Sequence, residues 1–125
     1  MIIHQYRIYR CDLRANPAFT YVFGCNEARY GLGGQAAEMR GEKNAHGIAT
    51  LRAPGVFWSD SDRARQCQVL AADFEPLFNI AERGGVIVLP IDGVGTGLAR
   101  LEERAPQTFA YLQKLWKHLI DKGSK

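Results

Sequence analysis

A short apolar run that passes directly into a glycine-rich loop constrains this sequence more than any other feature. The run is Val86 to Leu89, and its length and apolarity predict a fully buried strand. Pro90 ends it, and glycines follow at every second position, at Gly93, Gly95 and Gly97. Because glycines let backbone N–H groups approach a ligand closely, such a loop after a buried strand is a typical anion site of α/β proteins. The alternative is a plain turn between a strand and a helix.

The composition is that of an ordinary globular domain. The chain has 125 residues, of which 46% are hydrophobic and 23% charged, and its net charge is +3. These values argue against disorder. Lys and Arg are interleaved with Asp and Glu, so no basic tract predicts nucleic-acid binding. We expect one domain over residues 1–121, followed by a polar C-terminal tail at residues 122–125.

The cysteines and histidines give no sign of a metal site. Cys11, Cys25 and Cys67 are odd in number and lack C-x-x-C spacing, and the three histidines are far apart in the sequence. The N-terminus has no apolar leader, and no apolar run approaches the length of a membrane span. We therefore expect a cytoplasmic protein in a reducing compartment, without a metal or a cofactor. The oligomeric state is left open.

The remaining pattern predicts strands that alternate with helices. Runs rich in β-branched and aromatic residues predict strands, at residues 2–10, 19–24 and 46–52. Residues 11–17 are expected to form a turn. Helix formers and capping residues predict helices, at residues 35–40, from Ser59–Ser61 to about Arg83, and from Pro106 onward. Pro76 predicts a kink in the second helix or two helices in succession. This order predicts an α/β fold with a largely parallel or mixed sheet.

A second glycine-rich loop precedes the first predicted helix. Its sequence, Gly31-Leu32-Gly33-Gly34-Gln35-Ala36, matches the G-x-G-x-x-A pattern of dinucleotide-binding turns. The loop before the first glycine is too long for the tight turn of that fold. No acidic residue ends the following strand, and the chain is too short for two nucleotide-binding halves. These departures disfavour a Rossmann fold.

Taken together, the two loops resemble those of a macrodomain. Cys11-Asp12-Leu13-Arg14 stands where that family has G-D-I-T, and Phe23-Gly24-Cys25-Asn26 stands where it has N-A-A-N. The Gly31–Gly34 loop and a short helix follow. Leu89-Pro90, Gly95-Thr96-Gly97 and Glu102-Glu103 then resemble the second loop of the family, with one additional residue between Pro90 and Gly95. The resemblance covers nearly the whole chain in the family's order and implies a three-layer α/β/α sandwich.

This resemblance implies a cleft for ADP-ribose, or a related ADP-ribosyl nucleotide, at the carboxyl ends of the strands. The cleft would be lined by Asp12, Asn26, Gly31, Gly33, Gly34, Gln35, Gly93, Val94, Gly95, Thr96 and Gly97. Asp12 would accept a hydrogen bond from the adenine amino group, and Asn26 would face the distal ribose. The glycines would present N–H groups to the phosphates, with the N-terminus of the helix after Gln35 on one side and the Thr96 hydroxyl on the other. Asp12 and Asn26 could instead be turn residues. Phe57 or Trp58 could stack on a base or belong to the core.

The resemblance leaves hydrolysis open as an alternative to binding. In the branch similar to terminal ADP-ribose protein glycohydrolases, an aspartate falls at the position of Ala99, and the lysine-bearing strand end resembles Ile48–Ala53, which has no lysine. A second branch relies on the phosphate of the substrate and a bound water, with help from the asparagine of the N-A-A-N motif. Asn26 would be that asparagine, with Asp92 or Glu27 as the base. Such an enzyme would remove ADP-ribose from a protein, a nucleic acid or a small metabolite. A third reading is a scaffold that has lost its ligand.

Overall fold

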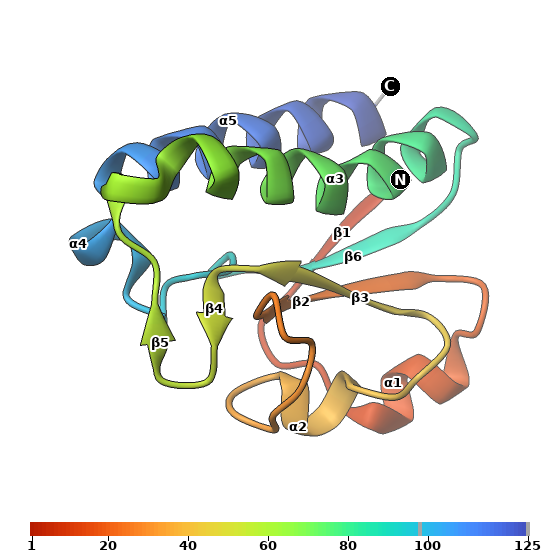
Figure 1. The fold of residues 1–125 in the computed structure, drawn as a ribbon. Helices are drawn as coiled ribbons and strands as arrows, with labels where there is room; N and C mark the ends of the chain where they lie inside the picture. The colour runs from red at the N-terminus through yellow and green to blue at the C-terminus, as the bar shows by residue number, and fades with distance from the viewer. Residues whose placement is uncertain (98, 125) are drawn as a thin grey trace.

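Four parallel strands form the central sheet of the molecule (Figure 1). The structure is a computed structural model that describes residues 1–97 and 99–124. Within these residues the strands are β1 (Ile2–Gln5), β2 (Thr20–Cys25), β3 (Ala45–Ala49) and β6 (Ile87–Pro90). They lie in the order β1-β6-β2-β3, and all neighbours are parallel. The mixed α/β class is therefore as expected, with a sheet that is wholly parallel in the part described.

Helices cover both faces of this sheet (Figure 1). Helices α1 (Arg10–Ala15) and α2 (Ala36–Met39) lie on one face. The long helices α3 (Arg63–Glu82) and α5 (Pro106–Gly123) pack on the other, and the 3-10 helix η1 (Asp60–Asp62) precedes α3. An antiparallel hairpin of β4 (Leu51–Ala53) and β5 (Val56–Phe57) projects beyond the end of β3, and α4 (Leu101–Arg104) leads into α5.

The side chains of the sheet fill two apolar layers by simple alternation. Along β2, Val22 faces the layer under α3 and α5, whereas Tyr21 and Phe23 face the layer under α1 and α2. Along β6, Leu89 and Val88 divide in the same way. This period of two places the central strands β2 and β6 between two cores, which is why their sequences are largely apolar.

Strand β1 is shorter than predicted, and the predicted turn after it is a helix. The strand ends at Gln5, and residues 10–15 form α1. The Asp12 carboxylate fixes the start of α1, since its Oδ2 accepts the N–H of Tyr9 at 2.9 Å. This capping contact stabilises a short helix that propensity alone does not reveal. Likewise, the strand predicted over residues 46–52 is divided between β3 and the hairpin, which are in separate sheets.

Helix α3 continues through Pro76 as one element. Pro76 has no N–H to donate to the carbonyl one turn earlier. The carbonyl of the next residue in that turn, Asp73, has a partner outside the helix, since its oxygen lies 2.6 Å from His46 Nε2. A carbonyl only accepts, so Nε2 carries the proton. The prediction of two successive helices is therefore wrong.

Helix α5 extends beyond the boundary expected for the domain. Residues 122 and 123, predicted to belong to a polar tail, continue the helix. Gly123 is buried, and a Cβ at that position would come within 2.4 Å of Ile2 Cγ1. Lys122 Nζ lies 2.8 Å from Glu82 Oε1 on α3. The end of α5 therefore packs against the first strand and the neighbouring helix.

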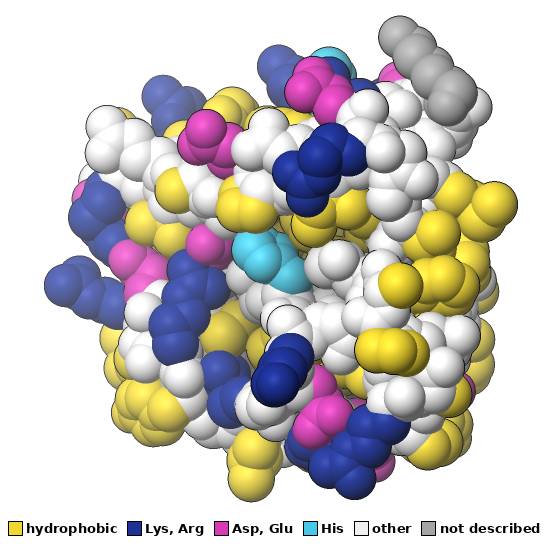
Figure 2. All heavy atoms as spheres, turned by 90° about the vertical axis from the view of Figure 1, so that its right-hand side faces the viewer, with side chains coloured by type: hydrophobic (Ala, Val, Ile, Leu, Met, Phe, Trp, Pro, Cys, Tyr) yellow, Lys and Arg dark blue, Asp and Glu magenta, His cyan; other side chains and the backbone are white. Residues whose placement is uncertain are grey.

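On the face drawn in Figure 2, the charged side chains do not form a patch of one sign. Acidic and basic side chains are interspersed there with hydrophobic ones. In the part of the chain that the structure describes, no helix is long and apolar enough to cross a membrane.

Candidate nucleotide pocket

A pocket of about 500 Å³ opens at the carboxyl ends of the parallel strands. Three segments form its walls: the loop that follows β2, the β4–β5 hairpin, and the glycine loop that follows β6. Strands β2 and β6 are neighbours, yet β2 leads to α2 on one face and β6 leads toward α5 on the other (Figure 1). Ligands of open α/β sheets bind at such a reversal, because the diverging loops leave a crevice between them.

The pocket brings together most of the predicted ligand-binding residues. Asn26, residues 31–35 and residues 95–97 all line it. Val94 lies beneath, buried against Gly24, where a Cβ on that glycine would be 3.7 Å from Val94 Cβ. The second glycine loop therefore lies directly over the end of β2. Leu98, which follows Gly97 in the sequence, is outside the described residues.

Asn26 is the most informative side chain of the pocket. Only 6% of the residue is exposed, and its Nδ2 donates to the carbonyl oxygen of Tyr30 at 2.7 Å. Its Oδ1 is buried and, among the residues described, accepts no hydrogen bond. Leaving a buried amide oxygen without a donor costs about 1 to 3 kcal/mol. A ligand that donates to Oδ1 would recover this free energy.

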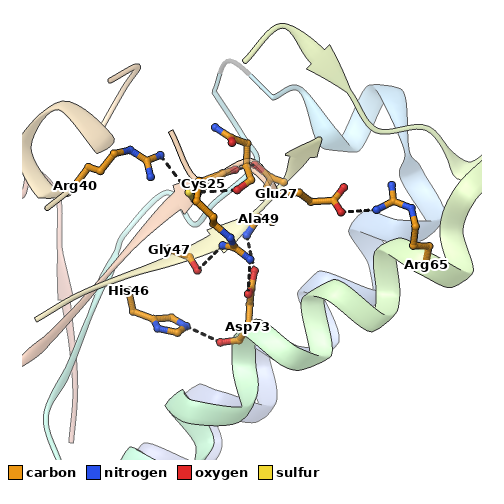
Figure 3. Close-up of polar contacts among 11 residues, drawn as sticks. Cys25, Glu27, Arg40, His46, Gly47, Ala49, Arg65 and Asp73 are labelled. Carbon is orange, nitrogen blue, oxygen red and sulfur yellow. Dashed lines mark hydrogen bonds and ion pairs between the residues drawn. The ribbon is translucent and has the colours of Figure 1, made fainter. Parts of the chain in front are cut away.

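Arg40 is the one charged side chain that lines the described part of the pocket. Its guanidinium lies 5.5 Å from the centroid of the Phe23 ring and donates from Nε to the carbonyl of Gly31 at 2.7 Å. Nη2 lies 3.1 Å from Sγ of Cys25, as Figure 3 shows. Sequence reasoning missed Arg40, because nothing in the sequence shows that the residue after a short helix turns back to the preceding loop.

The loop after β2 is also fixed from the outside by Glu27. Its Oε2 accepts the indole N–H of Trp58 at 2.8 Å, and its Oε1 forms an ion pair with Arg65 (Figure 3). Both carboxylate oxygens are therefore engaged on the side of the hairpin and α3. Trp58 is 2% exposed and belongs to the core. Glu27 is thereby a structural link, and the structure does not place it on the pocket wall.

Arg29 makes the second external attachment of this loop. It has a left-handed φ of 59°, and its Nη2 lies 2.7 Å from Oδ1 of Asp73. Burial lowers the pKa of Arg29, but the hydrogen bond and negative charge of Asp73 outweigh it and leave the pKa above its usual value. The guanidinium thus stays charged, and the loop is anchored before any ligand arrives.

Both glycine loops leave backbone donors free. Within the described residues, the N–H groups of Gly31, Leu32, Gly33 and Gly34 donate to no other group of the chain. Gly31, Gly34 and Gly95 have φ of 103°, 57° and 80°, which other residues rarely adopt. Helix α2 has only four residues, so the loop N–H groups, rather than the helix dipole, carry the positive potential of this wall.

Four predicted residues do not line this pocket: Val94, which lies beneath it, and Asp12, Asp92 and Gly93. Asp12 is not on the pocket wall, and its Oδ2 also accepts from Gln5 Nε2 at 2.9 Å. Asp92 and Gly93 line a separate cavity of about 210 Å³ beside α5. Thr96 borders both spaces and donates its hydroxyl to the carbonyl of Asp92 at 3.2 Å. The Cys11–Arg14 motif therefore belongs to the start of α1. Asp92, the candidate base, lines a different cavity from Asn26.

The pocket also contains residues that the motifs did not single out. The hairpin contributes Pro54 and Gly55, and the loop after β2 contributes Tyr30. Phe57, for which the sequence left open a place in the core or against a base, also lines the pocket and is 37% exposed. The hairpin meets the loop closely, since a Cβ on Gly31 would be 3.1 Å from Pro54 Cγ. The Pro54-Gly55 pair signalled a turn, but only the folded chain shows which loop that turn faces.

In residues 1–97 and 99–124, no group of three or more His, Cys, Asp or Glu side chains is arranged to hold a metal ion.

The comparisons with known proteins identify one family. Neither the curated proteins nor the solved structures gave a match to the chain. Residues 3–115 match a family of unknown function (DUF7831), and the chain therefore belongs to that family.

Proposed function

We propose that the protein binds ADP-ribose, or a related ADP-ribosyl nucleotide, in the pocket between the two glycine loops. The observation that carries this proposal is the buried Oδ1 of Asn26, which has no donor among the described residues and belongs to a side chain that lines a pocket of about 500 Å³. A ribose hydroxyl is a donor of suitable size. The macrodomain resemblance assigns the ribose to the same asparagine, so the chemistry of the site and the motif agree.

The charge of the pocket supports an anionic ligand. Arg40 is the charged group on the described wall, and the loop of residues 31–34 presents N–H groups without acceptors. Clustered backbone N–H groups bind phosphate oxygens, and they do so best when the loop is already fixed. The attachments through Glu27 and Arg29 provide that rigidity. A diphosphate fits the two facing loops better than a single carboxylate would.

Binding is a better proposal than hydrolysis of an ADP-ribosyl bond. A hydrolase needs a group that moves protons within hydrogen-bond reach of the substrate. Of the side chains that commonly transfer protons, only Cys25 and Tyr30 line the described part of the pocket, which holds no Asp, Glu, His or Lys. Glu27 is engaged by Trp58 and Arg65, and Asp92 faces the smaller cavity. We therefore assign the pocket to recognition of the nucleotide, without turnover.

Thermal unfolding with ADP-ribose tests the proposal, and Gly97 provides the blocking variant. A Cβ at Gly97 would meet no atom within 4 Å, and Gly97 is on the pocket wall. Gly97→Val should therefore fold normally and fill the pocket. We expect ADP-ribose at 100 times its Kd to stabilise the wild type by about 2.7 kcal/mol. We expect little or no shift for Gly97→Val.

Asp92→Asn is the matched control. It alters the same loop on the side of the smaller cavity, and its shift with ADP-ribose should equal that of the wild type. Equal shifts for the wild type and Gly97→Val would place the ligand outside this pocket. A wild type that ADP-ribose does not stabilise at millimolar concentration would contradict the proposed function.

A further inference from the structure

Phe57 lines the pocket and, although its side chain is large and apolar, it is partly exposed. It lies at the end of the β4–β5 hairpin and is 37% exposed. The guanidinium carbon of Arg104, on α4, lies 3.7 Å from the centroid of its ring. Arg104 does not line the pocket, whereas Phe57 does. The pocket therefore borders the part of the ring that Arg104 leaves free.

An aromatic ring held in this way is a stacking platform. The cation–π contact fixes the orientation of the ring before a ligand arrives, so less conformational freedom is lost on binding. A nucleobase has an apolar face of matching size, and stacking of one base on an aromatic side chain raises affinity by roughly five- to hundredfold. The positive charge of Arg104 on the far side also suits a ligand that carries phosphates.

The part of the pocket wall that the structure describes holds no carboxylate that could accept a hydrogen bond from the adenine amino group. Asp12, which the resemblance assigns to adenine, lies outside the pocket, and its Oδ2 accepts from Tyr9 and Gln5. The described lining holds no other Asp or Glu. Stacking tolerates any base, because every base has a π face, whereas hydrogen bonding to a carboxylate selects one edge.

We propose that Phe57, backed by Arg104, stacks on the nucleobase of the ligand and that the pocket takes nucleoside diphosphate sugars with little regard to base identity. This inference rests on the proposed function and makes it more specific. Phe57 and Arg104 become determinants of affinity, and Asp12 is a helix-capping residue.

Calorimetric titration with two ligands tests the inference. ADP-ribose is compared with its deaminated analogue, in which hypoxanthine replaces adenine and the amino group is absent. Stacking predicts affinities within about threefold of each other. Recognition of the amino group by a carboxylate predicts a loss of more than about tenfold for the analogue and for Asp12→Asn. Either loss would overturn the inference.

Variants of Phe57 supply the second arm. Phe57→Leu keeps an apolar side chain and removes the π face, so ADP-ribose should bind about tenfold more weakly. Phe57→Trp should restore binding, and Tyr6→Ala, an exposed aromatic outside the pocket wall, should leave it unchanged. Circular dichroism verifies folding. Unaltered affinity of Phe57→Leu would overturn the inference alone, whereas a wild type that binds neither ligand would overturn the proposed function as well.

Discussion

Nη2 of Arg29 and Oδ1 of Asp73 lie 2.7 Å apart, and the two side chains together cover the free edge of strand β3. Arg29 Nη1 donates to the carbonyl of Gly47 at 3.3 Å, and Asp73 Oδ2 accepts the N–H of Ala49 at 2.8 Å. β3 is the last strand of the sheet, and these two groups point away from its only neighbour, β2. The ion pair replaces the missing strand and blunts an edge that could pair with another chain. The same Arg29 fixes the loop that forms the pocket.

Removal of this pair should lower stability and uncover the edge. Asp73→Ala leaves the N–H of buried Ala49 without its acceptor and removes the carboxylate that pairs with Arg29. We expect the free energy of unfolding in urea to fall by about 1 to 3 kcal/mol and self-association to rise. Asp121→Ala removes an exposed partner of Lys117 and should change stability by less than about 0.5 kcal/mol. Equal effects of the two variants would show that Asp73 does not protect the edge.

The start of α5 should make stability depend on pH through Asp60. Burial by itself raises the pKa of Asp60, but hydrogen bonds from the backbone N–H groups of Gln107 and Thr108 outweigh it, and the pKa lies below its usual value. A carboxylate with a lowered pKa stabilises the fold above the pKa it has in the unfolded chain. This stabilisation is lost as the pH falls through the folded-state pKa.

The comparison of wild type with Asp60→Asn isolates this contribution. We expect the wild type to be the more stable protein at pH 7, and the difference in unfolding free energy to shrink as the pH falls below about 4. Glu103→Gln, which changes an exposed partner of Arg100, serves as the control with no such trend. A difference that stays constant between pH 7 and pH 3 would contradict the capping role.

Cys25 reports on occupancy of the pocket. It lines the pocket and is 5% exposed, whereas Cys11 is exposed on α1. A maleimide should therefore label Cys11 faster than Cys25. ADP-ribose at 100 times its Kd should slow the labelling of Cys25 by about a hundredfold, because only the free protein reacts. Labelling of Cys11 in the same sample is the internal control. Slowing at both cysteines would indicate a global effect of the ligand.

The sequence contained enough to predict the strands and the two glycine loops, and less of what surrounds them. Val86–Leu89 and Phe19–Gly24 are apolar because both of their faces are buried, so the pattern identified β6 and β2 directly. Asn26 and the glycines of both loops follow these strands and come together on the pocket wall for the same reason. Parallel strands bring their carboxyl ends to one edge of the sheet.

Residues whose role depends on a distant partner could not be predicted in this way. Asp12 has the same local sequence whether it caps α1 or contacts a base, and only its bond to Tyr9 decides. Arg40 reaches the pocket by turning back from the end of α2. The sequence left open whether Phe57 or Trp58 lies in the cleft, and only the folded hairpin places Phe57 on the pocket wall and Trp58 in the core. Helix α1 was missed because six residues of modest propensity form a helix only when capped and packed.

Isothermal titration of ADP-ribose into the wild-type protein and into Asn26→Ala measures how far the pocket depends on its buried amide. We expect saturable binding by the wild type at one site per chain. Loss of the Asn26 acceptor, together with its anchor to Tyr30, should weaken binding by about tenfold or more. Absence of heat from the wild type at millimolar ligand would contradict binding of ADP-ribose in this pocket, and so would equal affinities of the two proteins.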